Sequence, residues 1–186
     1  MHQTIKKLVE KIVFFPVRVL RYLCSHSITM VYRLILGSVA NSVKINCGVH
    51  INNCSNVFIK NNSLIDVGVS ISSESNEGYL RIGSNTQINR NVFIDFSGGV
   101  DIGDGVTISE SAMVYTHSHG LDPRSHPTFS PLSIGDNVWI GVRVVVMPTC
   151  NFIAQNVVIG ACSVVTKDIT QPGVYAGSPA RFLRHL

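Results

Sequence analysis

The chain has 186 residues, enough for one domain with a sizeable core. Hydrophobic residues make up 45% of it and charged residues only 14%, which argues against extended disorder. The net charge of +4 is concentrated in residues 1–36, which carry +5, and the nearly neutral remainder argues against a nucleic-acid-binding surface.

The sequence predicts neither a membrane span nor a secretory leader. No stretch reaches 18 uncharged apolar residues, and the early apolar run is interrupted by Arg18 and Arg21. The five cysteines form no C-x-x-C pair, which favours free thiols in a reducing compartment. We therefore expect a cytoplasmic location.

Residues 1–38 are predicted to form an N-terminal helical segment. Ile5, Leu8 and their neighbours follow helical spacing, Pro16 should break or kink this first helix, and a second helix is expected over about 17–36. Two interpretations remain open. In the first, the segment is a cap on the next domain or a trimer contact. In the second, it is a basic amphipathic surface that rests on the anionic inner face of a membrane.

A six-residue aliphatic repeat organises residues 39–170. The repeat predicts one inward side chain per hexad, stacked on its equivalents in neighbouring coils, and each such burial contributes roughly 1.5–3 kcal/mol. Six triples carry this spacing: Val39, Ile45, Ile51; Ile59, Ile65, Ile71; Ile82, Ile88, Ile94; Ile102, Ile108, Val114; Ile134, Ile140, Val146; and Phe152, Val158, Val164.

The steps between the triples show where insertions enter. Within a triple the step is always six, whereas between triples it is 8, 11, 8, 20 and 6 residues. Three flat faces per coil, with one corner that tolerates insertions, explain this pattern. It indicates an all-β solenoid of about six triangular coils, rather than a β-sandwich with short strands.

The stretches "SIGDNVWIG", "VVIGACSVVTKDI" and "VYAGSPARFLR" resemble the hexapeptide-repeat acetyltransferases. The resemblance is strong over about residues 80–186 and weaker over 39–79. It implies a left-handed parallel β-helix over 39–170, a C-terminal tail over 171–186, a homotrimer, and acetyl-CoA as co-substrate.

The longest insertion, residues 115–133, contains three histidines: His117, His119 and His126. A long polar loop on a rigid scaffold is a good place for chemistry. The histidines could bind zinc, as in the carbonic-anhydrase-like members of the family, or be exposed loop residues, or supply a general base. The local spacings do not match the three-histidine metal site, and we expect no metal.

The segment "YTHSHGLDP" is similar to the branch that acetylates sugars, and that alignment puts the catalytic histidine at His119, with His117 as the second candidate. The chemistry suits the residue. Acetyl-CoA is already activated, but a sugar hydroxyl is protonated at neutral pH, and an imidazole with a pKa near 6.5 can accept its proton.

The resemblance assigns further residues on both sides of the reaction. Substrate contacts are expected at Asp95, Trp139 and Tyr115, and Asp95 could instead orient the imidazole or be a solvated corner residue. Trp139 could equally pack against the long loop. Acetyl-CoA contacts are expected at Gly141, Ala161, Thr166, Lys167, Arg181 and Arg184, although the last three cations could also form an ordinary solvated face.

These expectations lead to an acetyl-CoA-dependent O-acetyltransferase that acts on a sugar hydroxyl, and the expected acceptor belongs to a surface polysaccharide. Two alternatives remain open: an acetyltransferase for a small soluble sugar or amino sugar, and a non-catalytic or metal-binding β-helix. The expected partners are acetyl-CoA, the sugar acceptor and two further copies of the chain. Peripheral contact with the cytoplasmic membrane through residues 1–36 is the alternative role of the helical segment.

Overall fold

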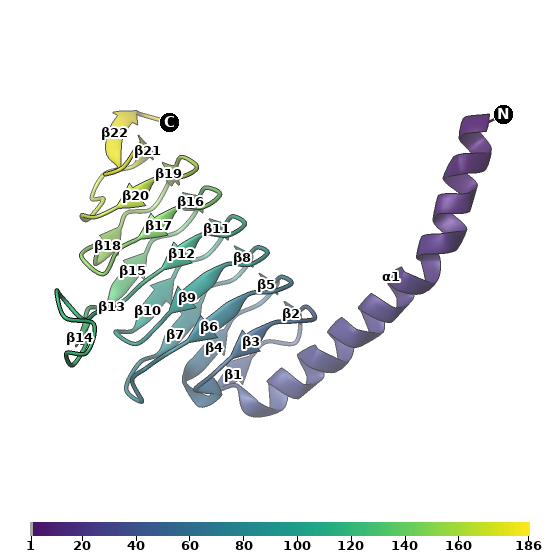
Figure 1. The fold of residues 1–186 in the computed structure, drawn as a ribbon, viewed down its shortest axis with the longest axis horizontal. Coiled ribbons are helices and arrows are strands. Elements are labelled where there is room, and N and C mark those ends of the chain that lie inside the picture. Colours follow the sequence, from purple (N-terminus) through teal and green to yellow (C-terminus); the bar gives the residue numbers. More distant parts are fainter. Residues whose placement is uncertain (1) are drawn as a thin grey trace.

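The computed structural model describes the backbone from His2 to Leu186 and the side chains from Val13 onward. A single long helix, α1 (His2–Ile35), precedes a stack of short strands that ends near the C-terminus (Figure 1). The side chains of Lys6, Lys7 and Lys11 lie outside the described residues.

The strands form three sheets that run along the stack, and we name these sheets A, B and C in the order in which each coil visits them. Sheet A contains β1 (Ser38–Val39), β4 (Val57–Ile59), β7 (Leu80–Ile82), β10 (Val100–Ile102), β15 (Leu132–Ile134) and β18 (Phe152–Ile153). Sheet B contains β2 (Lys44–Ile45), β5 (Leu64–Ile65), β8 (Gln87–Ile88), β11 (Thr107–Ile108), β16 (Trp139–Ile140), β19 (Val157–Ile159), β21 (Gly173–Ala176) and β22 (Arg181–Arg184). Sheet C contains β3 (His50–Ile51), β6 (Ser70–Ser72), β9 (Phe93–Asp95), β12 (Met113–Val114), β17 (Val145–Val146) and β20 (Val164–Val165).

Within these three sheets, neighbouring strands of successive coils are parallel, and the last pair in sheet B, β21 with β22, is antiparallel. Six complete three-strand coils are followed by an incomplete seventh, which is made by Ile169 and β21. The parallel β-helix expected from the hexads and from the family resemblance is therefore confirmed, with about one turn more than expected.

The core is the stack of inward aliphatic side chains. On sheet B, one such column consists of Ile45, Ile65, Ile88, Ile108, Ile140 and Ile159, all with 1% exposure or less. Each lies in register with the next, as Ile108 does with Ile140. Because every coil buries one aliphatic residue per face, the solenoid has a continuous core without packing a second layer against it.

The corners are built for tight turns. Asn62, Asn85 and Asn137 adopt positive φ values of 55–57° there, a conformation that asparagine tolerates better than most residues. The amide of Asn62 also donates to the Asn85 side chain of the next coil, at 3.3 Å. The polar corner residues seen in the sequence thus turn the chain and link successive coils.

The register of the last complete coil differs from the expectation. Ile153, rather than Phe152, points inward, and the same shift of one residue turns Val158 and Val164 outward. One extra residue enters the corner after Val146, so the step between triples is seven. Since strand side chains alternate, a shift of one residue exchanges the two faces, and Phe152 is 41% exposed.

Of the break or kink expected at Pro16, the break is absent and the second helix is not separate, because α1 continues through this proline. A proline inside a helix removes one backbone hydrogen bond and can bend the axis without ending the helix. The axis of α1 is indeed bent, and its first half diverges from the coil stack (Figure 1).

The second half of α1 covers the open end of the first coil. The Thr29 hydroxyl donates to the Ile45 carbonyl at 2.9 Å and accepts from the Ile45 amide, and the Tyr32 hydroxyl donates to the Val49 carbonyl at 3.0 Å. Leu36, at the end of the helix, is buried. This part of the segment is therefore a cap, as one of the two interpretations predicted. In the described part of the chain, no helix holds an apolar stretch long enough to cross a bilayer.

Candidate active site

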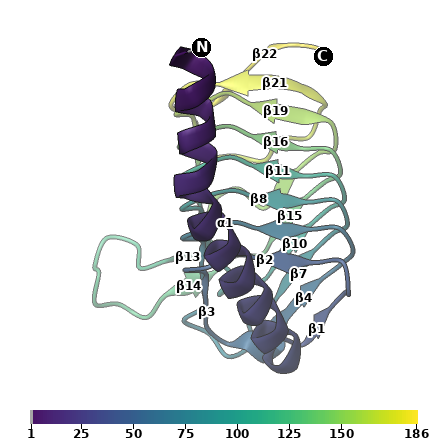
Figure 2. The same ribbon diagram turned by 90° about the vertical axis from the view of Figure 1, so that its right-hand side faces the viewer.

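The candidate site lies at the corner between sheets C and A, which we call the C–A corner. The long loop leaves this corner after β12 and forms a two-stranded hairpin, β13 (His117–Ser118) with β14 (Thr128–Phe129). Figure 2 shows this hairpin and its loop projecting from the stack. The short 3₁₀ helix η1 (Cys54–Asn56) occupies the same corner at the end of the first coil, between β3 and β4.

A buried carboxylate positions the first histidine of the loop. Asp95, at the end of β9, is 1% exposed, and its Oδ2 lies 2.9 Å from His117 Nδ1. The same oxygen accepts from the Thr116 amide at 2.6 Å and from the Thr116 hydroxyl at 2.9 Å, while Oδ1 accepts from the amide and hydroxyl of Ser97. Asp95 therefore belongs to the framework of the site.

The charge state of Asp95 determines which proton His117 carries. Burial alone would raise the pKa of Asp95, but hydrogen bonds from Ser97, Thr116 and His117 outweigh it and hold that pKa below its usual value. The ionised carboxylate can only accept, so the proton of a neutral His117 is assigned to Nδ1. Its Nε2 then offers a lone pair, as a general base requires.

The second histidine is held by the loop itself. His119 Nδ1 lies 2.8 Å from the Ser125 carbonyl, and the Ser125 hydroxyl donates back to the His119 carbonyl. A carbonyl only accepts, so Nδ1 of His119 also carries a proton. The two imidazole rings meet edge to face, with centroids 5.4 Å apart.

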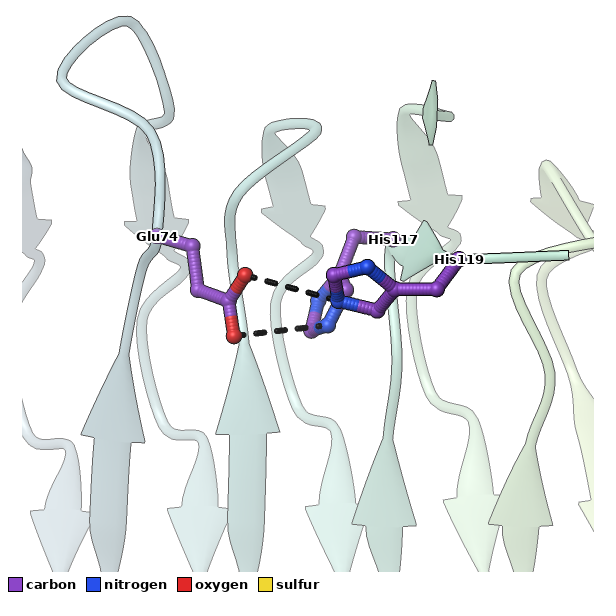
Figure 3. A group of neighbouring side chains, drawn as sticks. All are labelled: Glu74, His117 and His119. Carbon is purple, nitrogen blue, oxygen red and sulfur yellow. Dashed lines mark ion pairs between the residues drawn. The ribbon is translucent and has the colours of Figure 1, made fainter. Parts of the chain in front are cut away.

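Glu74 completes the cluster and was missed by the sequence analysis. Its two carboxylate oxygens lie 3.6 Å from His117 Nε2 and 3.8 Å from His119 Nε2, and Figure 3 shows the three side chains converging. Glu74 follows β6, and β6 pairs with β9 so that Ser72 is opposite Asp95. The hexad register could have found it, because Ile71, Ile94 and Val114 all end their triples at the C–A corner.

The same three side chains could hold a divalent cation. Glu74, His117 and His119 each offer one ligand atom, and these atoms lie within 4.8 Å of one another. Two imidazole nitrogens and one carboxylate are a donor set that zinc accepts. The side chain of Glu74 is 55% exposed, and exposed carboxylates often lie beside imidazoles without any metal.

A cavity of about 470 Å³ opens beside His117. It is lined by Tyr115, His117, Ser118, Thr128, Ser130, Met147, Pro148 and Thr149. Tyr115 is braced by Phe93, with ring centroids 5.3 Å apart. The cavity therefore places apolar surface and several hydroxyl groups next to His117.

The structure brings only some of the predicted contact residues to this corner. Thr166 lies near the cavity, because its carbonyl accepts from the Thr149 hydroxyl at 2.8 Å, and the exposed Lys167 follows it. Trp139, by contrast, stands on β16 in sheet B, 54% exposed, with its indole N–H donating to Ser109 at 2.9 Å. Within one chain, Trp139 therefore lies on a different face from the histidine loop.

The remaining predicted acetyl-CoA contacts also lie elsewhere. Gly141 and Ala161 stack at the corner between sheets B and C, where a Cβ on Gly141 would lie 2.6 Å from the Ile159 carbonyl oxygen. This glycine is thus required by packing between coils. Arg181 and Arg184 stand exposed on β22, at the C-terminal end of sheet B.

Comparisons with known proteins agree with this architecture, although no family model matches the sequence. The chain is 38% identical over 118 residues to galactoside O-acetyltransferase from Escherichia coli K12, covering 58% of each protein. It is 31% identical over 147 residues to a protein of the same organism named as a lipopolysaccharide biosynthesis O-acetyl transferase, WbbJ, covering 68% of this chain and 74% of that one. The chain thus spans a little over half the length of the first of these relatives.

Solved structures show the same arrangement of coils. A hexapeptide-repeat-containing acetyltransferase from Vibrio cholerae, crystallised with acetyl coenzyme A, superposes with a TM-score of 0.63 at 30% identity, over 85% of this chain and 75% of that one. AntD, an N-acyltransferase from Bacillus cereus crystallised with dTDP and coenzyme A, has a TM-score of 0.73 at 21% identity, over 84% and 88%. At that identity, the second likeness concerns the fold alone.

Proposed function

Because the chain belongs to the hexapeptide-repeat acetyltransferase family, we propose that it transfers an acetyl group from acetyl-CoA to a hydroxyl group of a sugar. The observation that carries this proposal is the contact between the buried, ionised Asp95 and His117 Nδ1, which leaves a neutral His117 unprotonated at Nε2, in a residue that also lines a cavity. The relatives named as O-acetyltransferases support the reaction class.

In the proposed reaction, His117 Nε2 accepts the proton of the sugar hydroxyl while the oxygen attacks the thioester carbonyl. The tetrahedral intermediate then collapses, the C–S bond breaks, and the CoA thiolate recovers the proton from the imidazolium. A positioned base contributes roughly 10²–10⁴-fold to such a reaction, and holding both substrates together supplies much of the rest. No covalent enzyme intermediate is needed.

Asp95 is a positioning residue in this mechanism. It holds the imidazole in the required tautomer and stabilises the imidazolium that forms, but it is too buried to contact the sugar. The motif alignment placed the base at His119, whereas the contacts favour His117, since His119 Nδ1 has only a backbone carbonyl as partner.

Steady-state kinetics on His117→Ala and His119→Ala test the proposal, with a thiol reagent to follow CoA release against a panel of sugars. We expect the first variant to lose transfer and the second to retain most of it. The reverse result would return the base to His119, and full activity in both would exclude a general base in this loop.

The acceptor that we favour belongs to a surface polysaccharide. The support is the likeness to the protein named for lipopolysaccharide biosynthesis, which covers more of both chains than the likeness to the galactoside enzyme. The panel should therefore contain free galactosides and oligosaccharide units side by side. Faster transfer to the free galactoside would favour the small-sugar alternative.

The Glu74, His117 and His119 cluster is the observation that keeps a metal-binding β-helix as the second candidate. Metal analysis of the purified protein separates the two. Stoichiometric zinc together with an absence of CoA release would replace the transferase proposal.

We further propose a homotrimer with clefts between subunits. The support is that Trp139 and the histidine loop, which the family resemblance places in one cleft, lie on different faces of a single chain. Light scattering should give three times the chain mass of 20.3 kDa. A fully active monomer would contradict this.

Finally, we propose that the protein is cytoplasmic and contacts the inner face of the membrane through α1. Large apolar side chains of this helix, such as Phe15 and Leu20, are 66% and 69% exposed. Cell fractionation with and without residues 1–36 tests this location.

A further inference from the structure

The second half of α1 turns an apolar side away from the coils. Leu20, Leu23, Val31 and Leu34 follow helical spacing on one side and are 55–86% exposed; we call these four residues the outer stripe. The opposite side of the helix carries the buried Ser25 and Thr29 against the first coil. A surface helix ordinarily turns its apolar side to the protein core, so an outward apolar stripe points to a further apolar environment.

The inner side of the helix faces a cavity of about 280 Å³ between α1 and the corner between sheets B and C. Beyond the first coil, the helix and the coil stack diverge (Figure 1). Its lining is polar and comes from the helix and from the first three coils: Arg18, Arg21, Tyr22, Ser25, Lys44, Asn46, Cys47, Asp66, Val67 and Arg90.

The charge of the cavity is strongly positive. Four cations line it against the single carboxylate of Asp66. That carboxylate already accepts from the Asn46 amide at 2.7 Å and the Val67 amide at 2.8 Å, and it lies 3.5 Å from Arg90 Nε. Among the side chains that the structure describes, Arg18, Arg21 and Lys44 form no ion pair. Three cations therefore face the cavity without a counter-charge.

We propose that this cavity binds the phosphate group of an anionic membrane lipid while the outer stripe lies in the apolar boundary of the bilayer. Guanidinium and ammonium groups are the usual phosphate ligands. An amphipathic helix sinks its apolar side about 5–10 Å below the headgroups, which leaves its polar side at the level of the phosphates. Free phosphate shares this chemistry, and the outer stripe is what favours a lipid as its source.

The inference rests on the membrane contact proposed above. It adds a phosphate-binding contribution from the solenoid, which a helix that adsorbs by itself would not need. Lys44 provides the sharpest test because it belongs to β2 and not to the helix. Lys60, which directly follows β4, is a matched control, since it is also an exposed lysine but does not line this cavity.

The experiment is co-sedimentation of the full chain with phosphatidylcholine vesicles that do or do not contain phosphatidylglycerol. We expect a clear preference for the anionic vesicles. Each cation near an anionic surface is worth about a fivefold change in binding, so Lys44→Ala should weaken binding to the anionic vesicles by about that factor and Lys60→Ala should not. Equal binding by the two variants would overturn the proposal.

Two further arms identify the source of the phosphate and the role of the stripe. Leu20→Asp should release the protein from vesicles without changing its mass by light scattering. A drop in mass would show instead that the stripe covers another copy of the chain. Saturable binding of inorganic phosphate without vesicle binding would show a soluble ligand. Either result would overturn the proposal of a lipid ligand. Transfer to a soluble sugar is measured on the same wild-type preparation, so a failed transferase assay with intact vesicle binding counts against the proposed function alone.

Discussion

The substitution Asp95→Asn tests how the buried carboxylate supports His117. The asparagine keeps the size of the side chain but replaces one oxygen by an NH₂ donor. If that NH₂ takes the place of Oδ2, it faces the N–H of Thr116, which has an acceptor there at 2.6 Å. If it takes the place of Oδ1, it faces the Ser97 amide, which has an acceptor there at 3.1 Å. Either orientation leaves one backbone N–H without its acceptor and removes the charge beside the imidazole.

The structure sets the size of both effects. A buried donor left without its partner costs about 1–3 kcal/mol, so the free energy of unfolding should fall by that amount near neutral pH. Loss of the carboxylate also removes the stabilisation of the imidazolium and, in the first orientation, inverts the tautomer of His117. We therefore expect kcat to fall by about 10²–10⁴-fold, the full contribution of a positioned base.

The dependence of stability on pH follows from the pKa of Asp95, which lies below the ordinary value. A carboxyl with a lowered pKa in the folded state stabilises the fold above its unfolded pKa of about 3.9, and that contribution is lost as the pH falls through the folded pKa. The difference in unfolding free energy between the wild type and Asp95→Asn should therefore be largest near neutral pH and shrink in acid.

The assays are CoA release at saturating substrates and denaturant unfolding at several pH values. Asp101→Asn is the control, because Asp101 carries the same charge on the outer side of sheet A, with a side chain that is 42% exposed. It should change neither kcat nor stability by much. A kcat for Asp95→Asn close to that of the wild type, in a folded protein, would refute the role of the carboxylate.

Three other outcomes test the site and the fold. Ile153→Ala should cost about 2–5 kcal/mol of unfolding free energy and Phe152→Ala clearly less, since only Ile153 is buried; the reverse order would restore the six-residue step before the last coil. Lys167→Ala and Arg181→Ala should each raise the KM for acetyl-CoA with a smaller effect on kcat, as expected for residues that hold the CoA phosphates; unchanged KM values would remove both from the donor site. Glu74→Gln should lower kcat by less than about fivefold, because ion pairs with an exposed carboxylate are worth only about 0.2–1 kcal/mol. A larger loss of kcat, measured across the pH–rate profile, would mean that Glu74 takes part in proton transfer.

The hexad spacing alone is enough to predict the coil. A strict spacing of six, with an isoleucine or valine in nearly every hexad, leaves few other ways to bury those side chains, and the longer steps after every third hexad locate the corner that carries the loop. Because the third hexads of successive coils end together, the same spacing also brings Asp95 and the start of the histidine loop to one corner.

Tertiary structure decided the contacts that depend on one residue or one rotamer. The corner before β18 holds one more residue than the sequence spacing indicated, and a single residue is enough to exchange the two faces of the following strands. The pairing of Asp95 with His117 rather than His119 depends on how far each imidazole reaches from the first residues of the hairpin. The orientation of the apolar side of α1 could not be predicted either. Helical periodicity shows that a helix has an apolar and a polar side, but not which of them contacts the coil.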